Sequence, residues 1–118
     1  MSINVQGKVI ELDEEGFLAN LGDWDEHVAA ELAAQEGLEM TTERTVLVTK
    51  ARNYFLEKQS TPSTRDIIGM VAEQRGRDPI EERRAIDKHL YLLFPHGPDK
   101  QLAKIAGLPK PLPSDTEA

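Results

Sequence analysis

Hydrophobic and polar residues alternate around a glycine at the start of the chain. The apolar positions are Ile3, Val5, Ile10 and Leu12, and Gln6-Gly7 lies between the two pairs. Period-two spacing on both sides of a glycine predicts a β-hairpin over about residues 3–12. Because an isolated hairpin is only marginally stable in water, it has to pack against helices.

Beyond this segment, apolar residues recur at intervals of three and four, which is the spacing of a helix face. Capping residues, glycines and prolines divide the pattern into five predicted helices. The helices are expected from Asp23 to Gly37, from Thr41 or Thr42 to Ser60, from Pro62 to Gly76, from Pro79 to Phe94, and from Pro98 to Gly107. Thr61 is expected to cap the third of them. Pro109, Pro111 and Pro113 cannot continue a helix, so they predict an extended C-terminal arm.

The 118 residues are enough for one domain. The pattern predicts the mainly α (α+β) class, as a small five-helix domain with an N-terminal β-hairpin and an extended arm. We place the domain at residues 1–107 and the arm at residues 108–118. Aromatic side chains on the helix stripes are expected in the core, and they are Trp24, Tyr54, Phe55, Tyr91 and Phe94.

Charge is distributed unevenly along the chain. Residues 1–43 carry a net charge of −10, residues 44–110 a net charge of +5, and the last eight residues −2. An acidic protein is a poor ligand for nucleic acid, although the middle of the chain can still present a basic face. A solvated helical surface is the alternative explanation of those basic residues.

No apolar run approaches the ~20 residues that a membrane-spanning helix needs. The first residues lack the basic start and apolar stretch of a signal peptide. We therefore expect a cytoplasmic protein with no membrane partner.

The residue types give no support for catalysis. The chain has no cysteine, which excludes disulfides, thiolate metal sites and persulfide chemistry on its own side chains. His27, His89 and His96 show no metal-ligand spacing, and no nucleophile has a visible Ser/His/Asp context. From these residues we expect no enzyme, no cofactor and no metal.

Three stretches carry a resemblance to a known family. They are "LDEEGFLANLGDWDEHVA" (residues 12–29), "LYLLFPHGPDKQ" (residues 90–101) and "KIAGLPKP" (residues 104–111). In this order they resemble the DsrC/TusE family, which includes the gamma subunit of dissimilatory sulfite reductase and a sulfur-relay protein of tRNA thiolation. The resemblance implies a helical domain with an N-terminal hairpin, a helix-turn-helix-like element and a flexible C-terminal arm that carries sulfur on a cysteine.

Both family cysteines are missing from this chain. By the resemblance, the cysteine near the end of the arm falls at Ser114, and the second cysteine of the sulfite-reductase branch falls at Ala103. A serine hydroxyl has no accessible anionic form near neutral pH and cannot become a persulfide. We therefore do not expect enzymatic sulfur transfer by this chain.

The resemblance leaves two functions open. The first is non-catalytic binding or regulation of sulfur-transfer or sulfite reductase proteins. Its predicted partner-binding residues are Arg65, Lys100, Lys104, Gly107, Leu108, Pro109, Lys110 and Pro111. The competing interpretation is that Leu108 and its prolines simply pack on the domain.

The second function is transcriptional regulation, with DNA as the partner of the helix-turn-helix-like region. The candidate phosphate contacts are Arg75, Arg77, Arg83, Arg84 and Lys88. The net charge and the acidic residues interleaved among these side chains count against DNA binding.

Overall fold

A computed structural model describes residues 1–112 of the chain. It contains the strands β1 (Ser2–Val5) and β2 (Lys8–Glu11) and a short 3-10 turn, η1 (Leu21–Asp23). The helices are α1 (Glu26–Gln35), α2 (Thr42–Lys58), α3 (Thr64–Arg75), α4 (Arg83–Leu93) and α5 (Pro98–Ile105). The predicted fold class, a five-helix domain with an N-terminal hairpin, is confirmed.

The two strands pair as an antiparallel hairpin with Val5 opposite Lys8. Gln6 and Gly7 both have positive φ, at 52° and 82°, as a two-residue type I′ turn requires. Ile10 on β2 is completely buried, and the hairpin packs on α1. The predicted hairpin and its turn are therefore confirmed.

The first helix begins later than the sequence pattern predicted. Asp23 belongs to η1, and the N-cap of α1 is Asp25, whose carboxylate accepts a hydrogen bond from the Val28 amide at 2.9 Å. Both aspartates can cap a helix by their chemistry. The prediction chose the wrong one.

Two further helix starts were also wrong. Ser63, rather than Thr61, caps α3 through a reciprocal capping box with Asp66. Pro79 does not begin α4, because the Asp78 carboxylate accepts from the Ile80 amide at 2.8 Å and holds a turn that precedes the helix. This local side-chain bond competes with helix formation at Pro79.

The core is built from two clusters of buried side chains. The larger cluster joins α2, α3, α4 and α5, and includes Leu47, Ile67, Ile86, Phe94 and Leu102. The smaller one joins the hairpin to α1 through Ile10, Leu12, Leu18, Val28 and Leu32. Trp24 packs against both clusters, so it connects the hairpin end of the molecule to the helical end.

Two predicted core aromatics are wrong. Tyr54 on α2 is only partly buried and belongs to neither core cluster. Tyr91 on α4 is 51% exposed, whereas Phe94 at the end of that helix is completely buried. The buried face of α4 carries Ile86, Leu90 and Leu93, which turns Tyr91 toward solvent.

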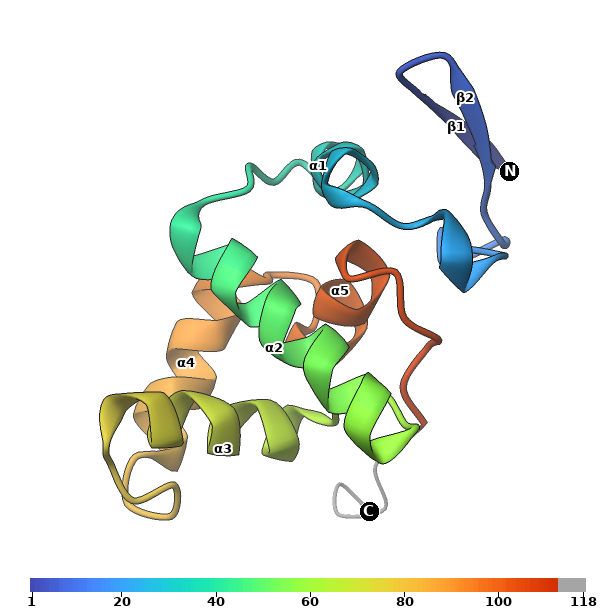
Figure 1. Cartoon of the computed structure of the whole chain (residues 1–118). Coiled ribbons are helices and arrows are strands. Elements are labelled where there is room, and N and C mark those ends of the chain that lie inside the picture. The colour runs from blue at the N-terminus through green and yellow to red at the C-terminus, as the bar shows by residue number, and fades with distance from the viewer. Residues whose placement is uncertain (113–118) are drawn as a thin grey trace.

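Figure 1 shows how the elements are arranged. The hairpin and α1 lie at one end, α3 and α4 lie at the other, and the arm runs from α5 alongside the C-terminal end of α2. Helices α3 and α4 pack on each other and are the pair expected to form the helix-turn-helix-like element. No helix within residues 1–112 combines the length and apolar character needed to cross a bilayer.

Candidate binding site at the C-terminal arm

The arm leaves α5 through a tightly bonded turn. The Gly107 amide donates to the Lys104 carbonyl at 3.2 Å and the Leu108 amide to the Ala103 carbonyl at 2.9 Å. These two bonds form the Schellman motif that ends many helices. Leu108 is only 3% exposed and belongs to the larger core cluster, so the first residue of the predicted arm packs as part of the domain.

Gly107 lies so close to Trp24 that any side chain there would clash with the indole. Its φ is +69°, and a Cβ atom built on it would lie 2.4 Å from Cδ1 of the indole. The indole Nε1 in turn donates to the Ile105 carbonyl at 2.9 Å. Glycine is therefore required here both for the backbone conformation and for the close approach.

Arg52 on α2 completes the turn from the other side. Its guanidinium lies over the Trp24 ring, 3.9 Å from the centroid, and its Nη1 donates to the Ala106 carbonyl at 2.7 Å. Burial lowers the pKa of Arg52 from its ordinary value. A stacked, charge-assisted contact of this kind fixes the direction in which the chain leaves α5. We call Trp24, Arg52 and the 105–108 segment the arm root.

The outer part of the arm lies along the loop that follows α2. Thr61 Oγ1 donates to the Pro109 carbonyl at 2.8 Å, and Pro111 is buried. Beside this contact is a hollow of about 530 Å³. Its lining residues are Phe55, Gln59, Ser60, Thr61, Ser63, Pro109, Lys110, Pro111 and Leu112.

The lysines predicted to bind a partner differ in their surroundings. Lys104 Nζ lies 3.5 Å from a Glu36 carboxylate oxygen, and both side chains are mostly buried. Lys110 Nζ lies 2.9 Å from Glu15 at the surface, and Lys100 is exposed on α5. The acidic N-terminal part of the chain thus supplies carboxylates to two of the three lysines.

Comparison with known proteins gives the family. The family described as DsrC like protein matches residues 4–113. The sulfurtransferase TusE of Escherichia coli strain K12 is 38% identical over 107 residues, which cover 91% of this chain and 94% of that protein. The chain belongs to the DsrC-like family.

Solved structures agree with this assignment. DsrC of Allochromatium vinosum, solved by NMR, is 40% identical with a TM-score of 0.81, over 97% of this chain and 99% of that one. The oxidized gamma subunit of the dissimilatory sulfite reductase from Archaeoglobus fulgidus is 31% identical with a TM-score of 0.78, over the same shares. The predicted resemblance to DsrC and TusE is therefore confirmed.

Ala103 and Ser114 occupy the two positions expected to hold the family cysteines. Ala103 lies on α5, is 1% exposed and is part of the larger core cluster. Ser114 lies outside the described residues. A methyl group at residue 103 fits the apolar surroundings and offers no chemistry.

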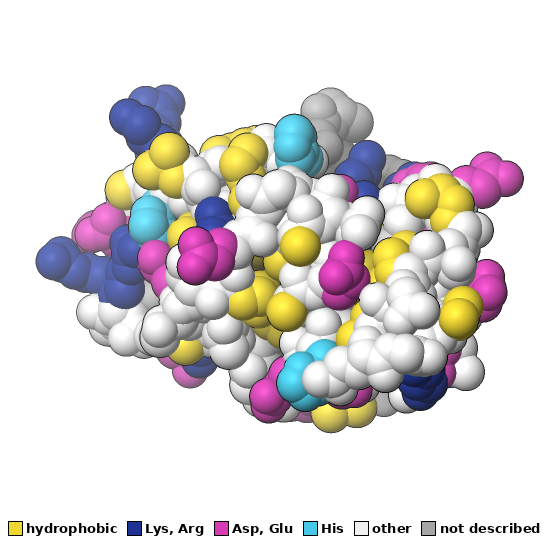
Figure 2. All heavy atoms as spheres, turned by 90° about the horizontal axis from the view of Figure 1, so that it is seen from above, with side chains coloured by type: hydrophobic (Ala, Val, Ile, Leu, Met, Phe, Trp, Pro, Cys, Tyr) yellow, Lys and Arg dark blue, Asp and Glu magenta, His cyan; other side chains and the backbone are white. Residues whose placement is uncertain are grey.

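The basic residues predicted to contact DNA are all exposed on α3, on α4 and between these helices. Arg77 lies 3.5 Å from Glu82, so at least one of these cations meets a carboxylate of the chain itself. The acidic residues Asp78, Glu81, Glu82 and Asp87 are interleaved with them. Figure 2, which is seen from the side of the hairpin and α1, likewise shows acidic side chains spread across that face. A mixed surface of this kind is typical of solvated helices.

Arg65 is separated from the other predicted partner-binding residues. It is exposed near the start of α3, where it lines a second hollow together with Arg83 and Ile80 rather than the hollow beside the arm. The sequence analysis grouped Arg65 with the arm only because Pro62 and Arg65 match a Pro-x-x-Arg pattern of the family that the chain resembles.

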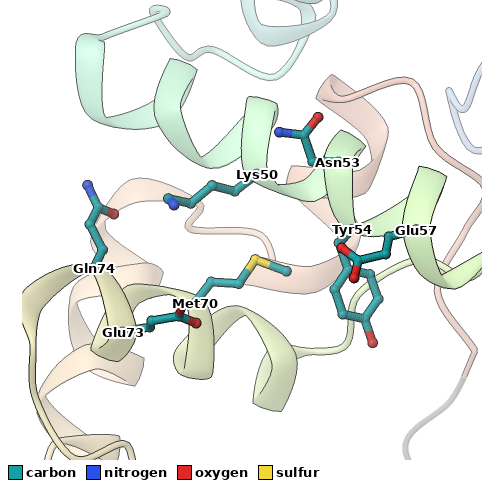
Figure 3. Close-up of a pocket in the computed structure, with 7 residues that line it drawn as sticks. All are labelled: Lys50, Asn53, Tyr54, Glu57, Met70, Glu73 and Gln74. Atoms are coloured by element: carbon teal, nitrogen blue, oxygen red, sulfur yellow. The ribbon is translucent and has the colours of Figure 1, made fainter.

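A third hollow of about 380 Å³ lies between α2 and α3 (Figure 3). Lys50, Asn53, Tyr54 and Glu57 line it from α2, and Met70, Glu73 and Gln74 line it from α3. Burial, followed by the Asp66 carboxylate, raises the pKa of Tyr54. The mixture of opposite charges is typical of a solvated groove between helices.

Within residues 1–112 no group of three or more acidic or histidine side chains is placed to hold a metal ion.

The sequence reading missed Arg52 and Thr61 as residues that hold the arm. Neither had a signal in the pattern, since Arg52 is one of many charged residues on a helix and Thr61 was assigned to a helix cap. Trp24 was predicted to be core, but its bond to the base of the arm was not.

Proposed function

We propose that this chain binds proteins of sulfur transfer or sulfite reduction without carrying sulfur itself. The relatives are named as a sulfurtransferase and as DsrC, the gamma subunit of a sulfite reductase. The single observation that carries the proposal is the combination of an arm root held by hydrogen bonds with an alanine at residue 103 and no cysteine anywhere in the chain.

The loss of sulfur chemistry follows from the side chains. Persulfide formation and exchange need a thiolate as the nucleophile or the carrier. The chain has no cysteine and therefore no thiolate. Its methionines cannot replace it, because a thioether has no ionisable proton. The arm of this chain can therefore act only through its shape and its charges.

The retained geometry favours binding. Bonds at Ile105, Ala106 and Pro109 hold the base of the arm in one direction, which reduces the entropy lost when a partner receives it. Lys100 and Lys110 are exposed, and such lysines steer an acidic partner toward the surface. When a partner binds, Lys110 leaves its ion pair with Glu15 and pairs with a carboxylate of the partner.

The test is calorimetric titration of the purified chain with the sulfite reductase and with the sulfur-transfer proteins of its own organism. A truncated chain that ends at residue 112 is titrated in parallel. The truncation stops there because removal of Leu108 would also disturb the core. The double variant Lys100→Glu/Lys110→Glu is compared with Lys88→Glu/Arg84→Glu, which reverses two exposed charges on α4. Weaker binding by the arm variant alone supports the proposal.

Two outcomes contradict it. The absence of binding to any of these proteins removes the proposed function. Binding to duplex DNA that depends on Arg84 and Lys88, and weakens steeply with salt, replaces it with the DNA-binding alternative.

A gain-of-function variant separates chemistry from binding. Ser114→Cys puts a thiol at the position where the resemblance expects the sulfur-carrying cysteine. Incubation with a persulfide donor should add the mass of one sulfur atom to this variant and none to the parent chain. Sulfur addition to the parent chain would overturn the claim that it carries no sulfur.

A further inference from the structure

A hollow of about 450 Å³ opens beside α3 at the turn that leads into α4. Its lining residues are Arg65, Ile68, Gly69, Pro79, Ile80 and Arg83. None of them lines the hollow beside the arm, and none belongs to the arm root. The two regions therefore present separate surfaces.

Gly69 keeps this hollow open. It lies in the interior of α3, where glycine costs about 0.5–1 kcal/mol of stability relative to alanine. A Cβ atom added there would meet nothing within 4 Å. The packing of the domain therefore gives no reason for a glycine, and the absent side chain leaves free space above α3.

Ile80 is held at the edge of the hollow with its side chain in solvent. It is 84% exposed, and the bond from its amide to the Asp78 carboxylate fixes the turn that presents it. Pro79 stiffens the same turn. One exposed apolar side chain is ordinary at a protein surface, but Ile80 lies beside the apolar lining of the hollow and extends it.

Arg65 and Arg83 also line the hollow, and both are exposed. Neither guanidinium has a carboxylate oxygen within 4.0 Å among residues 1–112, whereas Arg77 on the same connection pairs with Glu82. An occupant of the hollow thus meets apolar lining and two positive charges.

We propose that this hollow binds a segment of a protein partner in which one apolar side chain is flanked by carboxylates. The apolar side chain would fill the space above Gly69 and contact Ile80, and the carboxylates would pair with Arg65 and Arg83. Charge complementarity selects this occupant, because a nucleic-acid backbone would use the arginines but leave Ile80 without a contact. The inference goes beyond the proposed function and does not depend on the arm.

The probe is an acetylated, amidated peptide that has one leucine between two pairs of glutamates. It is titrated into the uniformly ¹⁵N-labelled chain, and amide chemical shifts are followed. The expected shifts centre on Gly69 and Ile80 and decrease as salt is added. A peptide with glycine in place of leucine should bind more weakly, and one with lysines in place of glutamates should leave the amides unmoved.

Two variants test the two halves of the contact. Arg65→Gln/Arg83→Gln should weaken binding by about two- to thirtyfold, which is the range for two exposed ion pairs. The matched control, Arg75→Gln/Arg84→Gln, removes the same charge from residues outside the hollow and should change the affinity little. Gly69→Leu should block the hollow, and Gly69→Gln should do the same where the leucine variant precipitates.

Several outcomes overturn the inference. They are an absence of shifts at millimolar peptide, equal effects of the two arginine pairs, equal binding of the leucine and glycine peptides, and shifts that centre on the arm. Concentration-dependent self-association through Ile80 also overturns it, since the occupant would then be a second copy of the chain. An absence of binding to sulfite reductase and to the sulfur-transfer proteins would not affect the peptide result, because those titrations test the arm and not this hollow.

Discussion

The arm root and the hollow beside α3 use the same kinds of residue in opposite ways. At the arm root a glycine, an arginine and an apolar side chain are satisfied within the chain, since Gly107 touches Trp24, Arg52 binds the Ala106 carbonyl and Leu108 is buried. In the hollow, Gly69 faces open space and Ile80 is exposed. Residue type alone therefore says little about whether a glycine or an arginine stabilises the domain or is free to meet a partner.

The largest expected effect is at the arm root. Gly107→Ala should lower the free energy of unfolding by about 3 kcal/mol, because alanine is strained at positive φ and its methyl group overlaps the Trp24 ring. The measurement is urea denaturation followed by circular dichroism. Gly37→Ala is the control, since φ is +75° there but nothing lies within 4 Å, and it should cost only about 1 kcal/mol. Equal costs at both positions would mean that the contact with Trp24 contributes nothing.

Removal of the guanidinium at the arm root should have the next largest effect. Arg52→Met keeps the apolar stem but loses the bond to the Ala106 carbonyl and the stacking on Trp24, at a cost of about 1–3 kcal/mol. Because Trp24 is the chain's single tryptophan, its fluorescence reports the change directly. Arg75→Met, on an exposed position of α3, should change stability by less than about 0.5 kcal/mol. An unchanged Trp24 spectrum in the Arg52 variant would contradict the stacked arrangement.

At the hollow the same glycine-to-alanine change should have the opposite sign. Gly69→Ala should raise the free energy of unfolding by about 0.5–1 kcal/mol, since alanine favours the helix and meets no other atom. The urea midpoint should rise with an unchanged slope. Destabilisation would contradict the open space beside Gly69.

The smallest effect concerns the surface ion pair of the outer arm. Lys110→Gln removes the partner of Glu15 and should cost at most about 0.5 kcal/mol, because both side chains are about half exposed. The difference should vanish in high salt, where exposed charges are screened. A larger, salt-independent cost would show that Lys110 holds the arm through more than this pair.

The order and type of the elements could be predicted from local patterns, but some helix starts could not. The hairpin turn, the glycine ends of α1 and α3, and the proline-rich arm follow from backbone preferences that act over a few residues. The starts of α1 and α3 each offered two possible capping residues, Asp23 or Asp25 and Thr61 or Ser63. Local side-chain bonds distinguish these neighbours, since Asp25 accepts from the Val28 amide and Ser63 forms a capping box with Asp66. Helix α4 begins later than predicted because Asp78 bonds to the Ile80 amide in the preceding turn.

The candidate site was predictable only where a motif marks it. "KIAGLPKP" located the base of the arm and the missing cysteines, and Gly107 was predicted to end a helix. The contacts that Arg52 and Thr61 make depend on how α2 lies beside the arm, which periodicity does not specify. The hollow at Gly69 was missed because the pattern treated α3 as a uniform apolar stripe.

Trp24 belongs to both hydrophobic clusters and also bonds to the Ile105 carbonyl. Local opening of the hairpin end therefore cannot proceed far without pulling the indole from the base of the arm. We therefore expect residues 1–24 and residues 105–108 to open as one cooperative unit, although they lie at opposite ends of the described sequence. Hydrogen exchange at the indole N–H and at the Leu108 amide should thus slow or quicken together when either end is altered.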